Sequence, residues 1–260
     1  MNYQHILLER RNGVGVVTMN RPEVLNAMND RLVEELHHAM RTLGGETEIG
    51  CLVFTGAGEK AFSAGGDIHE QRENDARYSQ EEIDRRGAAR ARMSYELAAC
   101  PKPTIGMMNG LAYGGAAVFA SSLDMRVGCE RTRFRFLAAA YGRINSTWTL
   151  PNQVGWPMAK ELLFTARVVE AEEAHRIGLL NHLVPGDELE AKTLELAGLI
   201  DGNHPGSVMG VKALLLEDLG AGLETQWQNE VHYTRNVMRG ARAEDAFPEF
   251  IARKGRSIPE

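Results

Sequence analysis

Two glycine pairs, Gly65-Gly66 and Gly114-Gly115, each stand where a short apolar run meets the predicted start of a helix. The first N–H groups of a helix have no partner within it, and the helix dipole is positive at that end. Such N–H groups can donate hydrogen bonds to an oxyanion. We therefore expect each turn to give one N–H to the same oxygen atom, which would stabilise negative charge there.

The elements that must position these turns are read from turn residues and hydrophobic spacing. Asn12-Gly13 predicts a hairpin between two strands, and Asn29 or Asp30 is expected to cap a helix that Gly44-Gly45 closes. Further strands are predicted at 51–55, 104–108, 125–128 and 133–136, a short helix and mobile loop at 68–82, and helices at 81–99 and 114–122.

The last quarter of the chain differs from the rest, because strands alternate with helices only up to about residue 185 and helices alone follow. This pattern predicts an α/β core over residues 1–200 and a helical C-terminal region over 201–260. Trp227, Tyr233, Phe247 and Phe250 in that region are expected either to enter the core or to cover a neighbouring subunit.

Composition excludes several classes of function. The chain has 260 residues, of which 43% are hydrophobic and 25% charged, as in soluble globular proteins. The net charge is −6 and no basic block alternates with aromatic residues, so nucleic acid is not expected as a partner. No apolar run is long enough to span a bilayer, and three widely spaced cysteines predict reduced thiols in a cytoplasmic protein with no metal site.

Two short segments are similar to known motifs, one to a nucleotide-binding loop and one to a nucleophile elbow, but neither matches its motif fully. Gly56-Ala57-Gly58 has Ala61 where a dinucleotide loop needs its third glycine, and no Gly-Lys-Ser/Thr follows. Ser63 stands near the pattern of a nucleophile elbow, with Asp187 and His204 as possible partners. A small serine in a tight turn is the favoured interpretation, and a serine hydrolase stays as a third alternative.

Taken together, the motifs resemble the crotonase (enoyl-CoA hydratase/isomerase) superfamily along nearly the whole chain. The matching pieces are Asn20-Arg21-Pro22, Asn26-Ala27-Met28, residues 61–68, Lys102-Pro103, Asn109-Gly110, Gly114-Gly115, Leu150-Pro151 with Gly155, and residues 171–184.

The resemblance implies a spiral of ββα turns with a helical C-terminal region, assembled as homotrimers or dimers of trimers. It implies an acyl-CoA thioester substrate, with no cofactor beyond that coenzyme A, whose carbonyl oxygen lies between the N–H groups of Gly66 and Gly115. By the same resemblance, coenzyme A is lined by Leu25, Ala27, Ala64, Asp67, Ile68 and His69, and Arg253 and Lys254 are candidates for its phosphates.

The chain departs from the family at both catalytic glutamates, which correspond to Val118 and Ala138. Neither side chain can move a proton, so the chain lacks the groups that the usual hydratase and isomerase mechanisms need. Tyr141, Arg143, Asn145 and Ser146 are the polar candidates for the acyl pocket, and Tyr141 and Asn145 are the predicted catalytic side chains. An enzyme with another proton path, of lyase, isomerase or hydrolase type, ranks ahead of a member that only binds acyl-CoA.

Overall fold

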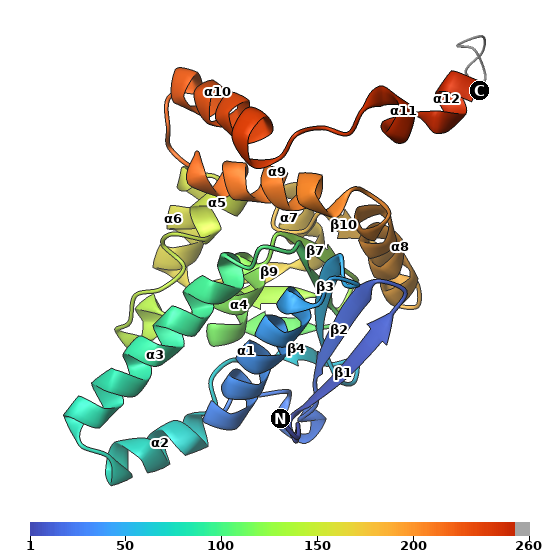
Figure 1. Ribbon diagram of the computed structural model, residues 1–260. Coiled ribbons are helices and arrows are strands. Elements are labelled where there is room, and N and C mark those ends of the chain that lie inside the picture. Colours follow the sequence, from blue (N-terminus) through green and yellow to red (C-terminus); the bar gives the residue numbers. More distant parts are fainter. Residues whose placement is uncertain (253–260) are drawn as a thin grey trace. The chain divides into compact units, whose positions relative to one another are not determined.

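The computed structural model describes residues 1–252, and its contacts divide the chain into two compact units after Pro205. The first unit contains every strand and both sheets, and the second is built from helices (Figure 1). Each unit is described by itself.

The larger sheet has six strands in the order β1-β2-β3-β5-β7-β10, and all neighbours are parallel except the antiparallel pair β1 and β2. The strands are β1 (Ile6–Arg11), β2 (Val14–Met19), β3 (Cys51–Gly56), β5 (Thr104–Met108), β7 (Met125–Gly128) and β10 (His182–Leu183). Asn12 and Gly13 join the first two with φ values of 47° and 78°, which fit the tight hairpin expected from the sequence.

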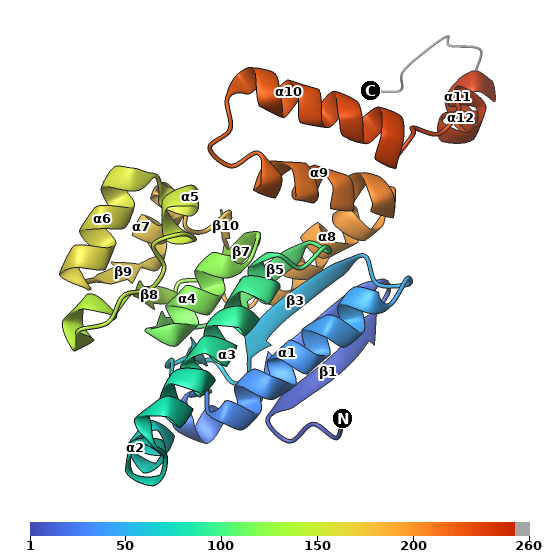
Figure 2. The same cartoon turned by 60° about the vertical axis from the view of Figure 1, so that its left-hand side comes forward.

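Both faces of this sheet are covered, and the alternation of side chains shows how. Val14, Val16, Cys51 and Val53 pack with residues of α8 (Leu189–Asp201). Val17, Met19, Leu52 and Phe54 point the other way and pack with α1 (Asp30–Gly45), as the side-chain period of a strand requires. Figure 2 shows α1 and α8 on opposite faces of these strands.

A second, four-stranded sheet takes the short strands in the order β4-β6-β8-β9. Its strands are β4 (Ala61–Ser63), β6 (Leu111–Tyr113), β8 (Arg133–Arg135) and β9 (Val168–Glu170). After β3 and β4 the chain forms α2 (Ile68–Arg77) and α3 (Gln80–Ala98), and after β5 and β6 it forms α4 (Gly115–Ser122). These repeated turns are the ββα spiral that the resemblance implied.

The remaining elements complete the two units. In the first unit these are 3-10 turns at Pro22–Val24 and Ala139–Tyr141, α5 (Leu150–Val154), α6 (Trp156–Thr165) and α7 (Ala171–Arg176). The second unit holds α9 (Pro205–Glu217), α10 (Leu223–His232), a π-helical turn at Tyr233–Val237, α11 (Ala243–Ala246) and α12 (Pro248–Ala252).

Two expectations need correction. The mobile loop predicted within residues 68–82 is absent from the described chain: α2 runs to Arg77, and α3 begins at Gln80 after Ser79 caps it by accepting from the N–H of Glu82. Trp227, Phe247 and Phe250 are 60% or more exposed, so they are not core residues of this chain.

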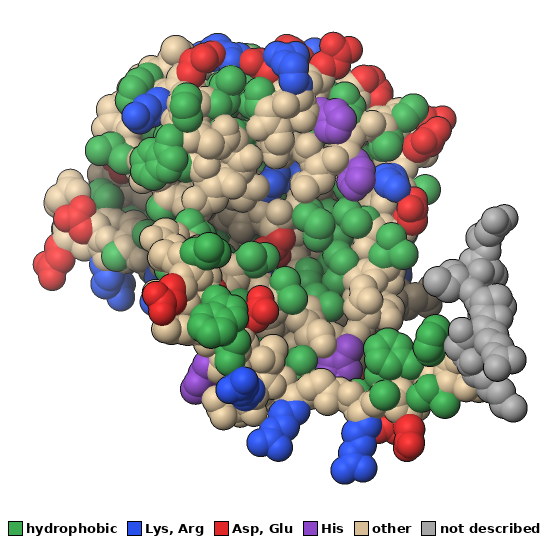
Figure 3. All heavy atoms as spheres, turned by 90° about the horizontal axis from the view of Figure 1, so that it is seen from above, with side chains coloured by type: hydrophobic (Ala, Val, Ile, Leu, Met, Phe, Trp, Pro, Cys, Tyr) green, Lys and Arg blue, Asp and Glu red, His purple; other side chains and the backbone are tan. Residues whose placement is uncertain are grey.

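The molecular surface mixes charges of both signs. On the face drawn in Figure 3, acidic and basic side chains lie among hydrophobic ones. Between residues 1 and 252, no helix has both the length and the apolarity that crossing a bilayer requires.

Candidate active site

The first glycine turn is held in place by the segment that precedes α1. The N–H of Met28 donates to the carbonyl of Gly65 at 2.7 Å, and the N–H of Asp67 donates back to Met28 at 3.0 Å. Gly65 has φ of +96°, a conformation that L side chains rarely adopt, and a Cβ there would collide with the carbonyl oxygen of Tyr113. Only glycine therefore allows the turn after β4 to approach the end of β6 so closely.

The second turn is shaped in the same way between β6 and α4. Gly114 has φ of 53° and ψ of −120°, and its N–H donates to the carbonyl of Arg135 at 2.9 Å. This bond ties the turn to β8 and leaves Gly115 as the first residue of α4. The N–H of Gly115 thus lies at the positive end of the helix dipole.

The two turns converge. A Cβ built on Gly65 would lie 3.2 Å from the amide nitrogen of Gly115, and one built on Gly115 would lie 3.7 Å from the amide nitrogen of Gly66. Within residues 1–252, neither the Gly66 N–H nor the Gly115 N–H donates to a protein acceptor. Two amides that are unpaired in the described chain therefore lie close to each other.

Both glycines line a cavity of about 950 Å³. Its walls come from α1, α2, α3 and α4 and from the segment after β8, and they are largely apolar. The apolar lining side chains are Met28, Val33, Leu36, Met40, Ala64, Ile68, Ala91, Met93, Leu97, Val118, Phe119, Leu137 and Ala138. Val118 and Ala138, the positions that the sequence resemblance equates with catalytic glutamates, thus line the cavity and bring no acid to it.

Three of the four polar candidates after β8 lie at this cavity. Tyr141, Arg143 and Asn145 line it, and Tyr141 is 71% exposed. Ser146 does not line it: its side chain is buried, and its Oγ has no hydrogen-bond partner in the described part of the chain. The Oδ1 atom of Asn145 is likewise buried without a partner there.

The residues expected to line coenzyme A divide into two groups. Ala64 and Ile68 line the cavity, whereas Leu25, Ala27, Asp67 and His69 are not among its lining residues. Residues 25–28 nevertheless run beside 64–67, since the N–H of Ala64 donates to the carbonyl of Leu25 at 2.9 Å. Arg253 and Lys254, expected near the phosphates, lie outside the described residues.

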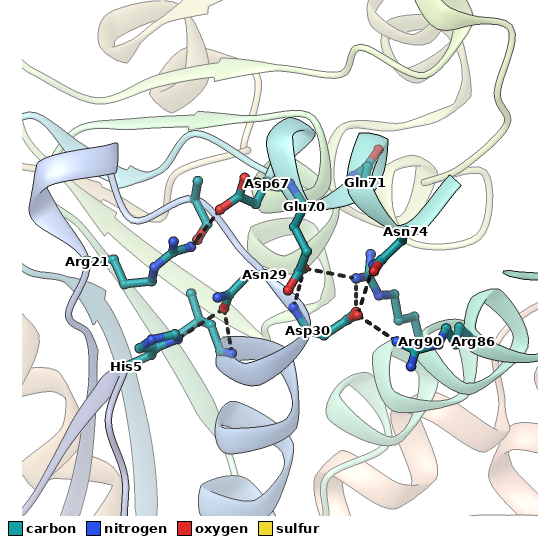
Figure 4. Close-up of polar contacts among 12 residues, drawn as sticks. His5, Arg21, Asn29, Asp30, Asp67, Glu70, Gln71, Asn74, Arg86 and Arg90 are labelled. Carbon is teal, nitrogen blue, oxygen red and sulfur yellow. Dashed lines mark hydrogen bonds and ion pairs between the residues drawn. The ribbon is translucent and has the colours of Figure 1, made fainter. Parts of the chain in front are cut away.

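A polar network fixes α2, which forms one wall. In Figure 4, Glu70 and Asn74 of α2 turn toward Asp30 at the start of α1, where Arg86 and Arg90 of α3 also reach. The carboxylate of Glu70 accepts from the N–H of Asp30 at 2.7 Å, and Arg86 donates to Asp30 at 2.8 Å. This cluster joins α1, α2 and α3, which are three of the four helices that line the cavity.

Two carboxyl groups of this wall have opposite pKa shifts. Burial and the nearby Asp30 carboxylate raise the pKa of Glu70 above its usual value. Burial also favours the neutral form of Asp67, but a hydrogen bond from Arg21 at 3.0 Å and backbone N–H groups outweigh it and hold the pKa of Asp67 below its usual value. Asp67 therefore stays ionised as the N-cap of α2, where a negative charge suits the helix dipole.

Sequence reasoning missed several cavity residues on the helices. Gln71, Arg72 and Asp75 of α2 and His37 of α1 all line the cavity. No motif marks them, because a polar residue on a helix faces a site only through the packing of that helix. His37 is bonded to Glu96 at 2.6 Å, and Asp75 is the one carboxylate among the lining residues of the described chain.

The serine hydrolase alternative is wrong in its central residue. The Ser63 side chain is fully buried, its hydroxyl donates to the carbonyl of Asn26 at 2.7 Å, and it accepts from the N–H of Gly65 at 3.1 Å. A buried hydroxyl with these two hydrogen bonds stabilises the turn and is not accessible to a substrate.

These features can be compared with known proteins. The enoyl-CoA hydratase/isomerase family model matches residues 9–254. The chain belongs to the enoyl-CoA hydratase/isomerase family. The family predicted from the sequence motifs is thereby confirmed, and so is the crotonase fold.

Individual family members are similar over most of their length. The short-chain-enoyl-CoA hydratase of Clostridium acetobutylicum is 32% identical to this chain, over 98% of this chain and 97% of that protein. The crotonyl-CoA hydratase of Syntrophomonas wolfei is 34% identical over 77% and 76% of the two chains. The crystal structure of an enoyl-CoA hydratase from Bacillus anthracis has a TM-score of 0.87 and 28% identity, covering 99% of this chain and 98% of that one.

Proposed function

We propose that this family member is an enzyme that binds an acyl-CoA thioester and stabilises an enolate or oxyanion on its carbonyl oxygen. The observation that carries the proposal is the pair of unpaired N–H groups, from Gly66 and Gly115, beside one cavity. Donors fixed before the reaction stabilise charge that develops in the transition state more than charge already present in the substrate. Glycine at both positions leaves room for the thioester to approach.

Coenzyme A, as part of the substrate, would follow the two adjacent segments 25–28 and 64–69. Ala64 and Ile68 line the cavity next to Gly66, and the other expected contacts lie on the same two segments. The proposal requires no further cofactor. By family resemblance we also propose a cytoplasmic homotrimer or dimer of trimers, which mass photometry would test.

By the sequence resemblance, Val118 and Ala138 stand at the positions of the usual glutamates, so the proton path that we propose does not use that pair. Both residues line the cavity. We assign Tyr141 as the group that exchanges a proton with the acyl chain and Asn145 as the group that orients the chain. Both side chains line the cavity on the segment that follows Ala138. Asp75 and His37 line other parts of the same cavity and are the alternative proton carriers.

The experiment follows proton exchange at the α-carbon of CoA thioesters in deuterated water, with a panel of saturated and α,β-unsaturated acyl groups and mass detection. Enolate stabilisation predicts deuterium uptake or product with at least one member. Tyr141→Phe and Asn145→Ala should slow that signal at least tenfold. Tyr95→Phe is the matched control, since Tyr95 is half exposed, contacts the Trp148 ring and does not line the cavity.

A second function, acyl-CoA binding without turnover, is favoured by one specific observation, the apolar side chains at both glutamate positions. Calorimetry that finds tight binding of a CoA thioester, with neither exchange nor product, would establish it. A panel in which no thioester binds would remove both functions.

A further inference from the structure

Arg143 carries a positive charge at the cavity that no described acidic side chain neutralises. Its guanidinium donates to the side-chain oxygen of Gln71 through Nη1 at 3.5 Å and Nη2 at 3.4 Å, and these long contacts to a neutral amide are its side-chain hydrogen bonds within residues 1–252. An arginine has five N–H donors in a planar arrangement that suits a carboxylate. Most of this donor capacity is available to a ligand.

The backbone holds Arg143 at the cavity. The carbonyl of Ala138 accepts from the N–H of Tyr141 at 3.1 Å and from the N–H of Arg143 at 2.8 Å. Gly142 between them has φ of 66°, so the chain reverses direction and returns Arg143 to the wall formed by Ala138. A hydrogen-bonded turn thus determines where the backbone of this arginine lies.

Gln71 connects Arg143 to the proposed oxyanion site. Gln71 belongs to α2, and a Cβ added to Gly66 would collide with its Nε2 atom, so the amide of Gln71 lies directly beside Gly66. The guanidinium contacts the other end of the same amide. A thioester carbonyl bound at Gly66 would therefore have the Gln71 amide and the Arg143 guanidinium close to it.

Two other ionisable side chains of the cavity have an acidic partner. Arg90 is paired with Asp30, and His37 is bonded to Glu96. Arg72 and Asp75 have opposite charges and are three residues apart on α2, but no ion pair joins them within residues 1–252. Arg72 and Arg143 are thus the two arginines of the cavity without an ion pair in the described chain, and Arg143 is the one that contacts Gln71 beside Gly66.

We infer that the acyl group of the substrate carries a carboxylate of its own, which Arg143 binds through paired hydrogen bonds and the Gln71 amide supports through its Nε2. This inference rests on the proposed function and names its substrate class. Arg143 is exposed beside a largely apolar wall, and a substrate carboxylate would give its guanidinium a charged partner that it can bind through two hydrogen bonds. A neutral acyl chain of the same length leaves the guanidinium without this partner.

The test compares dissociation constants for acyl-CoA pairs of matched chain length by calorimetry. The pairs are malonyl and propionyl, succinyl and butyryl, and glutaryl and valeryl. We expect at least one dicarboxylic member to bind about tenfold more tightly than its neutral partner, which corresponds to about 1.4 kcal/mol. The preference should fall as salt concentration rises.

Three variants test whether Arg143 itself, and not positive charge in the cavity in general, causes the preference for a dicarboxylic acyl group. Arg143→Gln should reduce the preference to threefold or less while neutral acyl-CoA binds as before, and Gln71→Glu should favour the neutral member through charge repulsion. Arg72→Gln is the matched control, because it removes a positive charge from the same cavity and should leave the preference intact. Thermal unfolding of each variant checks that the exposed substitutions leave the fold unchanged.

The inference is overturned if the wild-type protein binds the members of every pair equally. It is also overturned if Arg143→Gln weakens the binding of free coenzyme A and of neutral acyl-CoA by the same factor, since Arg143 would then bind a phosphate of coenzyme A. Both results leave the proposed function standing. Only the absence of binding by every thioester removes both.

Discussion

Replacing Gly115 by proline would delete one of the two proposed donors while keeping the backbone path. Gly115 is the first residue of α4, a position where proline is well tolerated because its missing N–H has no helical partner. An added Cβ would lie 3.1 Å from the flexible end of Met28 and 3.7 Å from the Gly66 nitrogen. Loss of one preorganised donor typically lowers kcat by about 10²–10³, or roughly 3–4 kcal/mol.

Gly115→Ala is the control for this variant. Alanine and proline place a Cβ at the same point, but only alanine retains the N–H. The ratio of the rates of the two variants therefore measures mainly the contribution of the hydrogen bond from this N–H. The assay is the rate of α-carbon deuterium exchange or of product formation with a thioester that the wild type accepts. We expect proline to be slower than alanine by at least about 100-fold. Rates within threefold of each other, with both variants folded, would refute the argument that this N–H stabilises the transition state.

Three further substitutions test the surrounding structure. Ser63→Ala should retain turnover and lose about 1 kcal/mol of unfolding free energy, measured in urea; wild-type labelling by a fluorophosphonate at Ser63 would contradict this. Burial would raise the pKa of Glu35, but hydrogen bonds from Arg31 and from the N–H groups of residues 4–5 hold it below its usual value. The wild type should therefore have a larger free energy of unfolding than Glu35→Gln. This difference should be complete above about pH 4.5 and disappear as pH falls through the lowered pKa of Glu35. A difference that does not change with pH would contradict this prediction. Arg126 is fully buried, and burial lowers its pKa to about 10. It donates to three backbone carbonyls and to Gln153. Arg126→Met leaves these buried acceptors unpaired and should cost at least about 2 kcal/mol in the same urea assay; a cost below about 1 kcal/mol would disprove that role.

The sequence was sufficient to predict elements whose signals are local. Asn12-Gly13 adopts the hairpin conformation, and the side chain of Asn29 caps α1 by accepting from the N–H of Leu32 at 2.9 Å. Gly65 and Gly114 likewise have positive φ values, as expected for glycine in tight turns. Local chemistry determines these features.

Other features depend on tertiary structure and left no local signal. β6 and β9 have three residues each, too few for a period of two to be recognised, and they exist because neighbouring strands pair with them. Gln71 and Asp75 lie on a polar helix where any face could be exposed, and only the packing of α2 directs them to the cavity. Ser63 matches a nucleophile pattern nearly as well as a structural one, and its burial decides between them.

The most direct test of the central claim is a crystal structure of the protein with a non-hydrolysable acyl-CoA analogue. We expect the carbonyl oxygen of the analogue to lie 2.7–3.1 Å from the amide nitrogens of both Gly66 and Gly115, the range for donors to an oxyanion. An analogue whose carbonyl oxygen contacts neither nitrogen, or only one of them, would contradict the claim.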